Sequence, residues 1–205
     1  MDTLPFDAVL CDFDGVVHLW DPDGMASLDR AWGLTEGTLA AAAFDGELLQ
    51  AAVTGRLSDE QWRGQVAQAL APVCGSPERA RGLVEAWSGL TGRVDPDVVD
   101  LLAVLRTRVP VVLVSNATTR LEAYLSAIGL DEAFDVVINT ARIGVAKPDR
   151  RVFDIAAQRV GADLKRCLFV DDTAAHVTAT QAAGATGVHY QHIKQLRAAA
   201  APLLD

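Results

Sequence analysis

The sequence predicts an α/β protein, in which a Rossmann-like core with a parallel sheet carries an inserted helical segment. Five short segments consist almost wholly of apolar residues, which is typical of strands that helices cover on both faces. From residue 96 onward these segments alternate with stretches of helical length, the pattern of a doubly wound sheet. The gap between the first two apolar segments, residues 17–92, is far longer than one crossover helix requires.

The expected strands end at turn residues or at pairs of polar residues. In chain order they cover residues 6–13, 109–115, 134–139, 167–170 and 186–190. Between the last four strands we expect helices over residues 118–128, 149–160 and 173–183, and each stops just before a glycine. The alanine-rich residues 198–201 are predicted to form part of a terminal helix.

The long gap contains helix signals of its own. Ser58 and Gln61 form a capping box that opens a helix through residue 70. Ser76 and Pro77 supply a cap and a first-turn proline for a helix through residue 87, and residues 38–44 are rich in alanine. We therefore expect a core formed by residues 1–16 and 93–205, with a helical lobe formed by residues 17–92.

Composition and charge restrict the class of protein. Half of the 205 residues are hydrophobic, which argues against disorder. The formal charge is −9, so general binding to nucleic acid is not expected. The three cysteines are too few and too far apart for a disulfide scaffold, which favours the reducing cytoplasm. The sequence has no apolar run of about 18 residues, so we expect no membrane span.

Polar residues follow the predicted strands at the points where the strands end. They are Asp12 and Asp14, then Ser115 and Asn116, then Lys147 in a loop, then Asp171 and Asp172. The carboxyl ends of parallel strands meet at one sheet edge, where α/β proteins bind ligands. A group of carboxylates there requires a cation, and oxygen ligands favour Mg²⁺, or equally Mn²⁺, over zinc.

This ordered set of motifs resembles the haloacid dehalogenase (HAD) superfamily, in its C1-capped, phosphatase-like branch (subfamily IA). The resemblance implies that the helical lobe is a cap, and that Asp12 is a nucleophile that forms an aspartyl-phosphate. It implies that Asp14 is the general acid and base, a residue that the dehalogenases proper lack. Ser115 and the Asn116 backbone N–H would bind phosphoryl oxygens, and Lys147 would offset negative charge. Asp12, the Asp14 carbonyl and Asp172 would hold Mg²⁺, with Asp171 reaching the ion through water.

The resemblance implies a phosphatase that acts on a small phosphorylated metabolite, with a sugar phosphate as the leading candidate. A phosphomutase and a non-catalytic phosphometabolite-binding protein stay open as alternatives. A signalling receiver domain fits poorly, because its phosphoacceptor follows the third strand, where this chain has Asn139 and Thr140. The oligomeric state is not predicted.

The roles of five further residues stay open. Four of them have two possible roles each, and the fifth is assigned none. His176 could hydrogen-bond a motif carboxylate or face solvent. His18 and Trp20 could line the substrate entrance or pack in the hinge of the lobe. Arg56 could contact substrate or be solvated. His189 is near the C-terminus, and we expect it to lie away from the motifs and assign it no role.

Overall fold

In the computed structural model, which describes residues 4–204, five parallel strands form one sheet in the order β5-β4-β1-β6-β7. The strands are β1 (Ala8–Cys11), β4 (Val111–Ser115), β5 (Val136–Asn139), β6 (Cys167–Asp171) and β7 (Thr186–His189). All five expected strands are present, and the predicted α/β fold class is confirmed. Strand β1 is central: Leu10 pairs with Val112 on one side and with Phe169 on the other.

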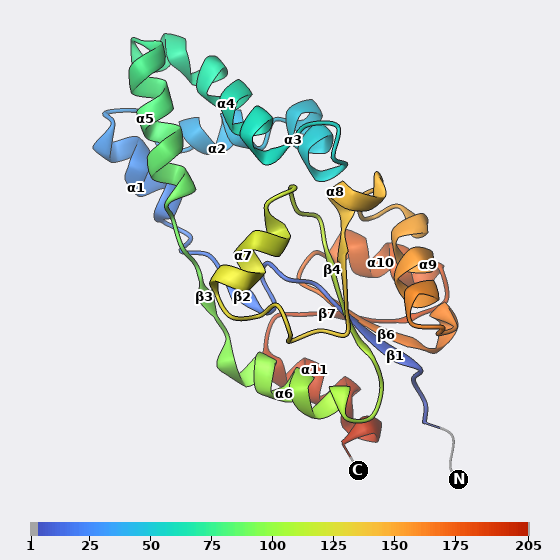
Figure 1. The fold of residues 1–205 in the computed structure, drawn as a ribbon. Coiled ribbons are helices and arrows are strands. Elements are labelled where there is room, and N and C mark those ends of the chain that lie inside the picture. The colour runs from blue at the N-terminus through green and yellow to red at the C-terminus, as the bar shows by residue number, and fades with distance from the viewer. Residues whose placement is uncertain (1–3, 205) are drawn as a thin grey trace.

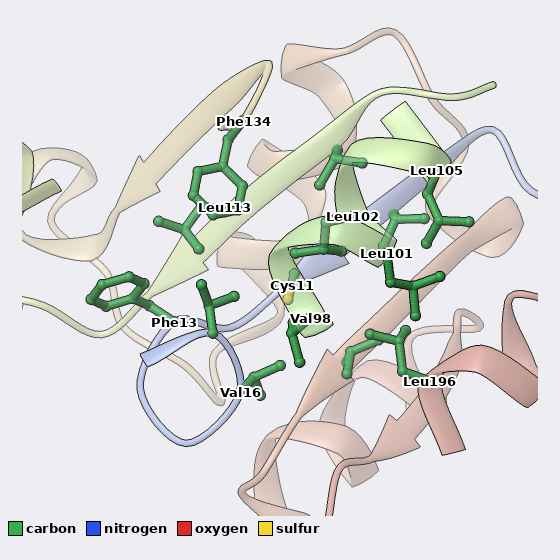
Figure 2. Close-up of a cluster of buried hydrophobic side chains, with 14 of the residues drawn as sticks. Cys11, Phe13, Val16, Val98, Leu101, Leu102, Leu105, Leu113, Phe134 and Leu196 are labelled. Atoms are coloured by element: carbon green, nitrogen blue, oxygen red, sulfur yellow. The ribbon is translucent and has the colours of Figure 1, made fainter. Parts of the chain in front are cut away.

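Helices cover both faces of this sheet. They are α6 (Pro96–Arg106), α7 (Leu121–Ala127), α8 (Thr140–Ile143), α9 (Arg150–Arg159), α10 (Ala174–Ala182) and α11 (Ile193–Ala199), with the short 3₁₀ turns η1 (Leu164–Arg166) and η2 (Ala201–Leu203). Because side chains alternate along a strand, Cys11 and Leu10 point into different apolar clusters. On one face, leucines of α6 gather around Cys11 and Leu113 (Figure 2). On the other face, Phe153 of α9 packs edge-on against Phe169.

Five further helices form a lobe of their own. They are α1 (Gly24–Ala31), α2 (Thr38–Ala43), α3 (Gly46–Val53), α4 (Asp59–Cys74) and α5 (Pro77–Ser88), and below "the lobe" means these helices with their loops. Leu39, Trp62 and Leu83 are buried in an apolar cluster that belongs to the lobe. Figure 1 shows the lobe beyond the end of the sheet, near α7 and α8.

The expected capping box begins α4, with both hydrogen bonds between Ser58 and Gln61 present. Helix α4 runs past the expected end at residue 70 to Cys74, although Pro72 lies within it. Helices α1 and α3 were not predicted from the sequence.

Two very short strands connect the lobe to the sheet. Strand β2 (His18–Leu19) leads out and β3 (Arg93–Val94) leads back, and the two pair antiparallel, His18 with Val94 and Leu19 with Arg93. The sequence analysis missed both, because two residues are too few to show strand periodicity. Within residues 4–204, no helix has both the length and the apolar character that a membrane crossing requires.

Candidate active site

Asp12 lies directly after β1, at the carboxyl edge of the sheet. Its backbone N–H donates to the Val170 carbonyl at 2.9 Å, so the residue is still held against β6. Its side chain is nearly buried, with 7% of the residue exposed. Oδ1 accepts from the Phe13 N–H at 2.8 Å and from Lys147 Nζ at 2.8 Å. Oδ2 has no hydrogen-bond partner among residues 4–204, so one oxygen is fixed and the other is available.

The chain turns sharply after Asp12. The Phe13 carbonyl accepts hydrogen bonds from the backbone N–H groups of residues 16, 17 and 18, which wraps the chain around it. Asp14 therefore leaves the strand, with 48% of its side chain exposed. Gly15 takes φ = +81°, and a Cβ there would lie 2.0 Å from Asp172 Oδ2. The Asp172 carboxylate thus rests against the backbone of this turn, in a space that only glycine leaves open.

Lys147 reaches the site from the loop between α8 and α9. The Asn116 side chain fixes this loop, since its Nδ2 donates to the Lys147 carbonyl at 2.9 Å and its Oδ1 accepts from the Lys147 N–H at 2.8 Å. The Lys147 ammonium lies between two carboxylates, 2.8 Å from Asp12 Oδ1 and 2.7 Å from Asp171 Oδ2. This role of the Asn116 side chain was not predicted.

Burial and charge act against each other in this group. Burial raises the pKa of Asp12 above its usual range, and the Lys147 ammonium opposes that rise. Burial also acts to raise the pKa of Asp171, but hydrogen bonds from His176 and the charge of Lys147 outweigh it and leave the pKa low. Burial lowers the pKa of Lys147, and the two carboxylates outweigh that effect, so the lysine stays charged. The group is therefore one buried cation shared by two carboxyl groups.

Two histidines also lie at this edge. His176 Nδ1 lies 3.0 Å from Asp171 Oδ2, so the interpretation of His176 as a carboxylate partner is confirmed. The Thr173 N–H donates to Asp171 Oδ1 at 2.8 Å. The prediction that His189 lies away from the motifs is wrong: its Nε2 is 2.8 Å from the Asp172 carbonyl. The β7 strand pairs with β6 and brings His189 beside Asp171, a proximity that sequence separation hides.

Ser115 and Asn116 end β4, next to β1. The Ser115 residue is 1% exposed, and within the described part of the chain its hydroxyl makes no hydrogen bond. The Asn116 backbone N–H likewise donates to no acceptor among residues 4–204. Both donors are therefore available at the sheet edge to which Asp12 belongs.

The lobe contacts the core beside this edge. The Asp59 N–H donates to Thr119 Oγ1 at 2.9 Å, and Thr118 Oγ1 donates to Asp59 Oδ1 at 2.7 Å. Gly55 lies so close to α8 that a Cβ there would stand 2.0 Å from the Ala141 carbonyl oxygen. These contacts were not predicted. Arg56 is exposed, and it lines a surface cavity of the lobe between α2, α3 and α4, rather than the carboxylate group.

The oxygen donors of the turn suit a hard divalent cation. Asp12 Oδ2 and the Asp14 carbonyl oxygen accept no hydrogen bond within residues 4–204, and the Asp172 carboxylate adjoins the same turn. All three are oxygen ligands, the kind that Mg²⁺ takes. Ligand atoms of Asp12, Asp171 and His176 also lie within 4.8 Å of one another. The Lys147 ammonium already supplies the positive charge in that second group, so the first set fits a metal better.

The order of the parallel strands, the residues at their carboxyl ends and the inserted helical lobe together define a class of hydrolases with a Rossmann-like core. Residues 6–184 match the haloacid dehalogenase-like hydrolase family, and the chain belongs to that family. The resemblance seen in the sequence is thereby confirmed.

Known relatives span more than one chemistry. The chain is 35% identical over 81 residues to pyrimidine 5'-nucleotidase YjjG of Escherichia coli, which covers 38% of this chain and 36% of the relative. It is 34% identical over 80 residues to an (S)-2-haloacid dehalogenase of Pseudomonas sp., covering 38% and 34%. These matches span about a third of each relative's length.

The fold is also found among solved structures. A HAD family enzyme of Bacteroides thetaiotaomicron, crystallised with magnesium and inorganic phosphate, superimposes with a TM-score of 0.72 at 17% identity, over 91% of this chain and 94% of that one. At this level of identity the similarity concerns the fold alone.

Proposed function

We propose that this protein is a Mg²⁺-dependent phosphatase that cleaves a small phosphomonoester through an aspartyl-phosphate on Asp12. The observation that carries the proposal is the Asp12 carboxylate itself. Its Oδ1 is fixed by the Phe13 N–H and by Lys147, while Oδ2 has no partner among residues 4–204. A fixed carboxylate with one free oxygen is suited to act as a nucleophile.

In the first step Asp12 Oδ2 forms a bond to phosphorus, and the ester P–O bond breaks. Asp14 gives its proton to the leaving alkoxide, then takes one from the water that hydrolyses the aspartyl-phosphate. The Ser115 hydroxyl and the Asn116 N–H donate to phosphoryl oxygens. The positive charge of Lys147 balances the negative charge of the buried carboxylates while further negative charge develops on the transferred phosphoryl group.

The metal set proposed here is Asp12, Asp172 and the Asp14 carbonyl oxygen. When bound, Mg²⁺ supplies positive charge beside the phosphoryl oxygens. Both oxygens of Asp171 are engaged with Lys147, His176 and Thr173, which agrees with a contact to the ion through water only. The Bacteroides enzyme, which shares this fold, was crystallised with magnesium and inorganic phosphate, and this supports the proposal of a magnesium ion and a phosphate group as ligands.

Asp14 favours phosphatase over dehalogenase chemistry. A halide leaves without needing a proton, whereas an alkoxide requires a general acid, and Asp14 provides a carboxyl two residues from the nucleophile. The similarity to a pyrimidine 5'-nucleotidase also supports phosphatase chemistry. We propose that residues 17–92 act as a cap over the site, which limits the substrate to a small molecule such as a sugar phosphate.

The test is phosphate release from a panel of small phosphomonoesters, with Mg²⁺ and with EDTA. We expect metal-dependent release that Asp12→Asn lowers at least about 10³-fold. The exposed Asp100→Asn is the matched control and should keep full activity. Activity that survives in Asp12→Asn, with contaminating phosphatases excluded, refutes the role of Asp12. Isomerised sugar phosphate in place of free phosphate would identify a mutase.

A further inference from the structure

His18 is a fully buried histidine at the start of β2, where the chain leaves the core for the lobe. Its ring stacks on Phe13, with centroids 5.0 Å apart and planes 6° from parallel. On another side it meets the returning linker, because a Cβ on Gly92 would lie 2.4 Å from His18 Nε2. Tyr124 and Trp20 approach the ring with their planes nearly perpendicular to it. The imidazole is therefore fixed on several sides.

Both ring nitrogens of His18 have partners. Nδ1 lies 3.1 Å from Asp14 Oδ1, and Nε2 lies 2.7 Å from the Tyr124 hydroxyl. Burial raises the pKa of Tyr124, so the phenol keeps its proton and can donate to Nε2. With Nε2 as acceptor, a neutral imidazole carries its proton on Nδ1 and donates it to the Asp14 carboxylate.

The same oxygen of Asp14 has a second donor. Trp20 Nε1 donates to Asp14 Oδ1 at 2.8 Å. Asp14 Oδ2 makes no hydrogen bond among residues 4–204. Two N–H groups, those of His18 and Trp20 on the segment that leads out to the lobe, thus fix one oxygen of a half-exposed carboxylate and leave the other available.

We infer that His18 is a positioning residue that holds the carboxyl of Asp14 in the orientation in which it serves as general acid. The inference rests on the proposed function, because it assigns Asp14 the protonation of the leaving group. A half-exposed aspartate is otherwise free to turn, and a general acid must lie within hydrogen-bond reach of the atom that it protonates. His18 acts through its bond to Asp14 and does not itself contact the substrate.

The basicity of the leaving group distinguishes a positioning role of His18 from a purely structural one. An alkyl phosphate releases a strongly basic alkoxide that needs a proton, whereas p-nitrophenyl phosphate releases a weakly basic phenolate. The readout is kcat/KM, which covers the step that forms the aspartyl-phosphate, measured on both esters with Mg²⁺. His18→Leu removes both hydrogen bonds, His18→Asn keeps an N–H near the position of Nδ1, and His18→Gln places its amide near Nε2.

We expect kcat/KM of His18→Leu to fall at least tenfold more on the alkyl ester than on p-nitrophenyl phosphate. His18→Asn should keep the ratio of the two values within about threefold of wild type, and His18→Gln should lose it as His18→Leu does. Equal losses on both esters in His18→Leu overturn the inference and indicate a packing role. If His18→Leu does not fold, equal ratios in His18→Asn and His18→Gln overturn it. A wild-type protein that hydrolyses neither ester overturns the proposed function, and the inference with it.

Discussion

Replacing Lys147 with methionine removes one buried positive charge and keeps nearly the same shape. The ammonium lies 2.8 Å from Asp12 Oδ1 and 2.7 Å from Asp171 Oδ2, and none of its side chain is exposed. Lys147→Met therefore leaves two carboxyl groups at the sheet edge without their shared cation. We expect the variant to be markedly less stable, and to regain stability relative to wild type as the pH falls.

Two arguments give the size of this effect. Removing one partner of a buried ion pair destabilises a protein by about 3–5 kcal/mol. If one of the two carboxyls takes up a proton instead, the cost is about 1.4 kcal/mol for each pH unit above its ordinary pKa of about 3.9, or about 4 kcal/mol at pH 7 and about 1.5 kcal/mol at pH 5. Such a carboxyl binds more protons in the folded variant than in the unfolded chain, so raising the pH destabilises the variant.

The free energy of unfolding is measured by urea denaturation at pH 7 and at pH 5, followed by circular dichroism, with EDTA present. The exposed Lys194→Met is the matched control, because it removes the same group from the surface, and it should change stability by less than about 0.5 kcal/mol. A Lys147→Met variant within about 1 kcal/mol of wild type at pH 7, or one whose deficit is the same at pH 5, refutes this account of the buried charges.

Two glycine substitutions test the metal set and the contact of the lobe. Gly15→Ala places a Cβ 2.0 Å from Asp172 Oδ2, and we expect it to weaken Mg²⁺ binding at least about tenfold by calorimetry. Gly55→Ala places a Cβ 2.0 Å from the Ala141 carbonyl oxygen, so it should lower kcat/KM severalfold by holding the lobe away from the core. Gly129→Ala shares the positive φ, at +73°, but meets nothing within 4 Å. It should show only the backbone strain of about 1–2 kcal/mol, and equal behaviour of all three variants would contradict both assignments.

The sheet could be predicted because its signals are local. Apolar runs mark each strand, and parallel strands have their carboxyl ends at one edge, so neighbouring strands in the sheet bring Asp12, Ser115 and Asp171 near one another. The contacts of Lys147 with Asp12 and Asp171 follow from this placement, although no spacing in the sequence gives their distances.

The remaining features depend on contacts between segments far apart in the chain. Tyr124 lies 106 residues from His18, and nothing in either segment indicates that they pair. The bonds of Asp59 to Thr118 and Thr119 likewise depend on how the lobe sits on the core. His189 was misjudged for the same reason, because strand order rather than chain order sets its distance from Asp172.

The pairing of β2 with β3 means that the inserted residues begin and end at one place. The lobe has its own apolar cluster, separate from the two clusters that flank the sheet. Residues of the lobe can therefore be exchanged, shortened or lengthened without altering the register of the five strands. If the proposed function holds, the lobe selects the substrate while Asp12, Asp14 and Lys147 of the core carry out the chemistry, so an ancestral enzyme would acquire a new specificity through changes in the lobe while these three residues stayed in place.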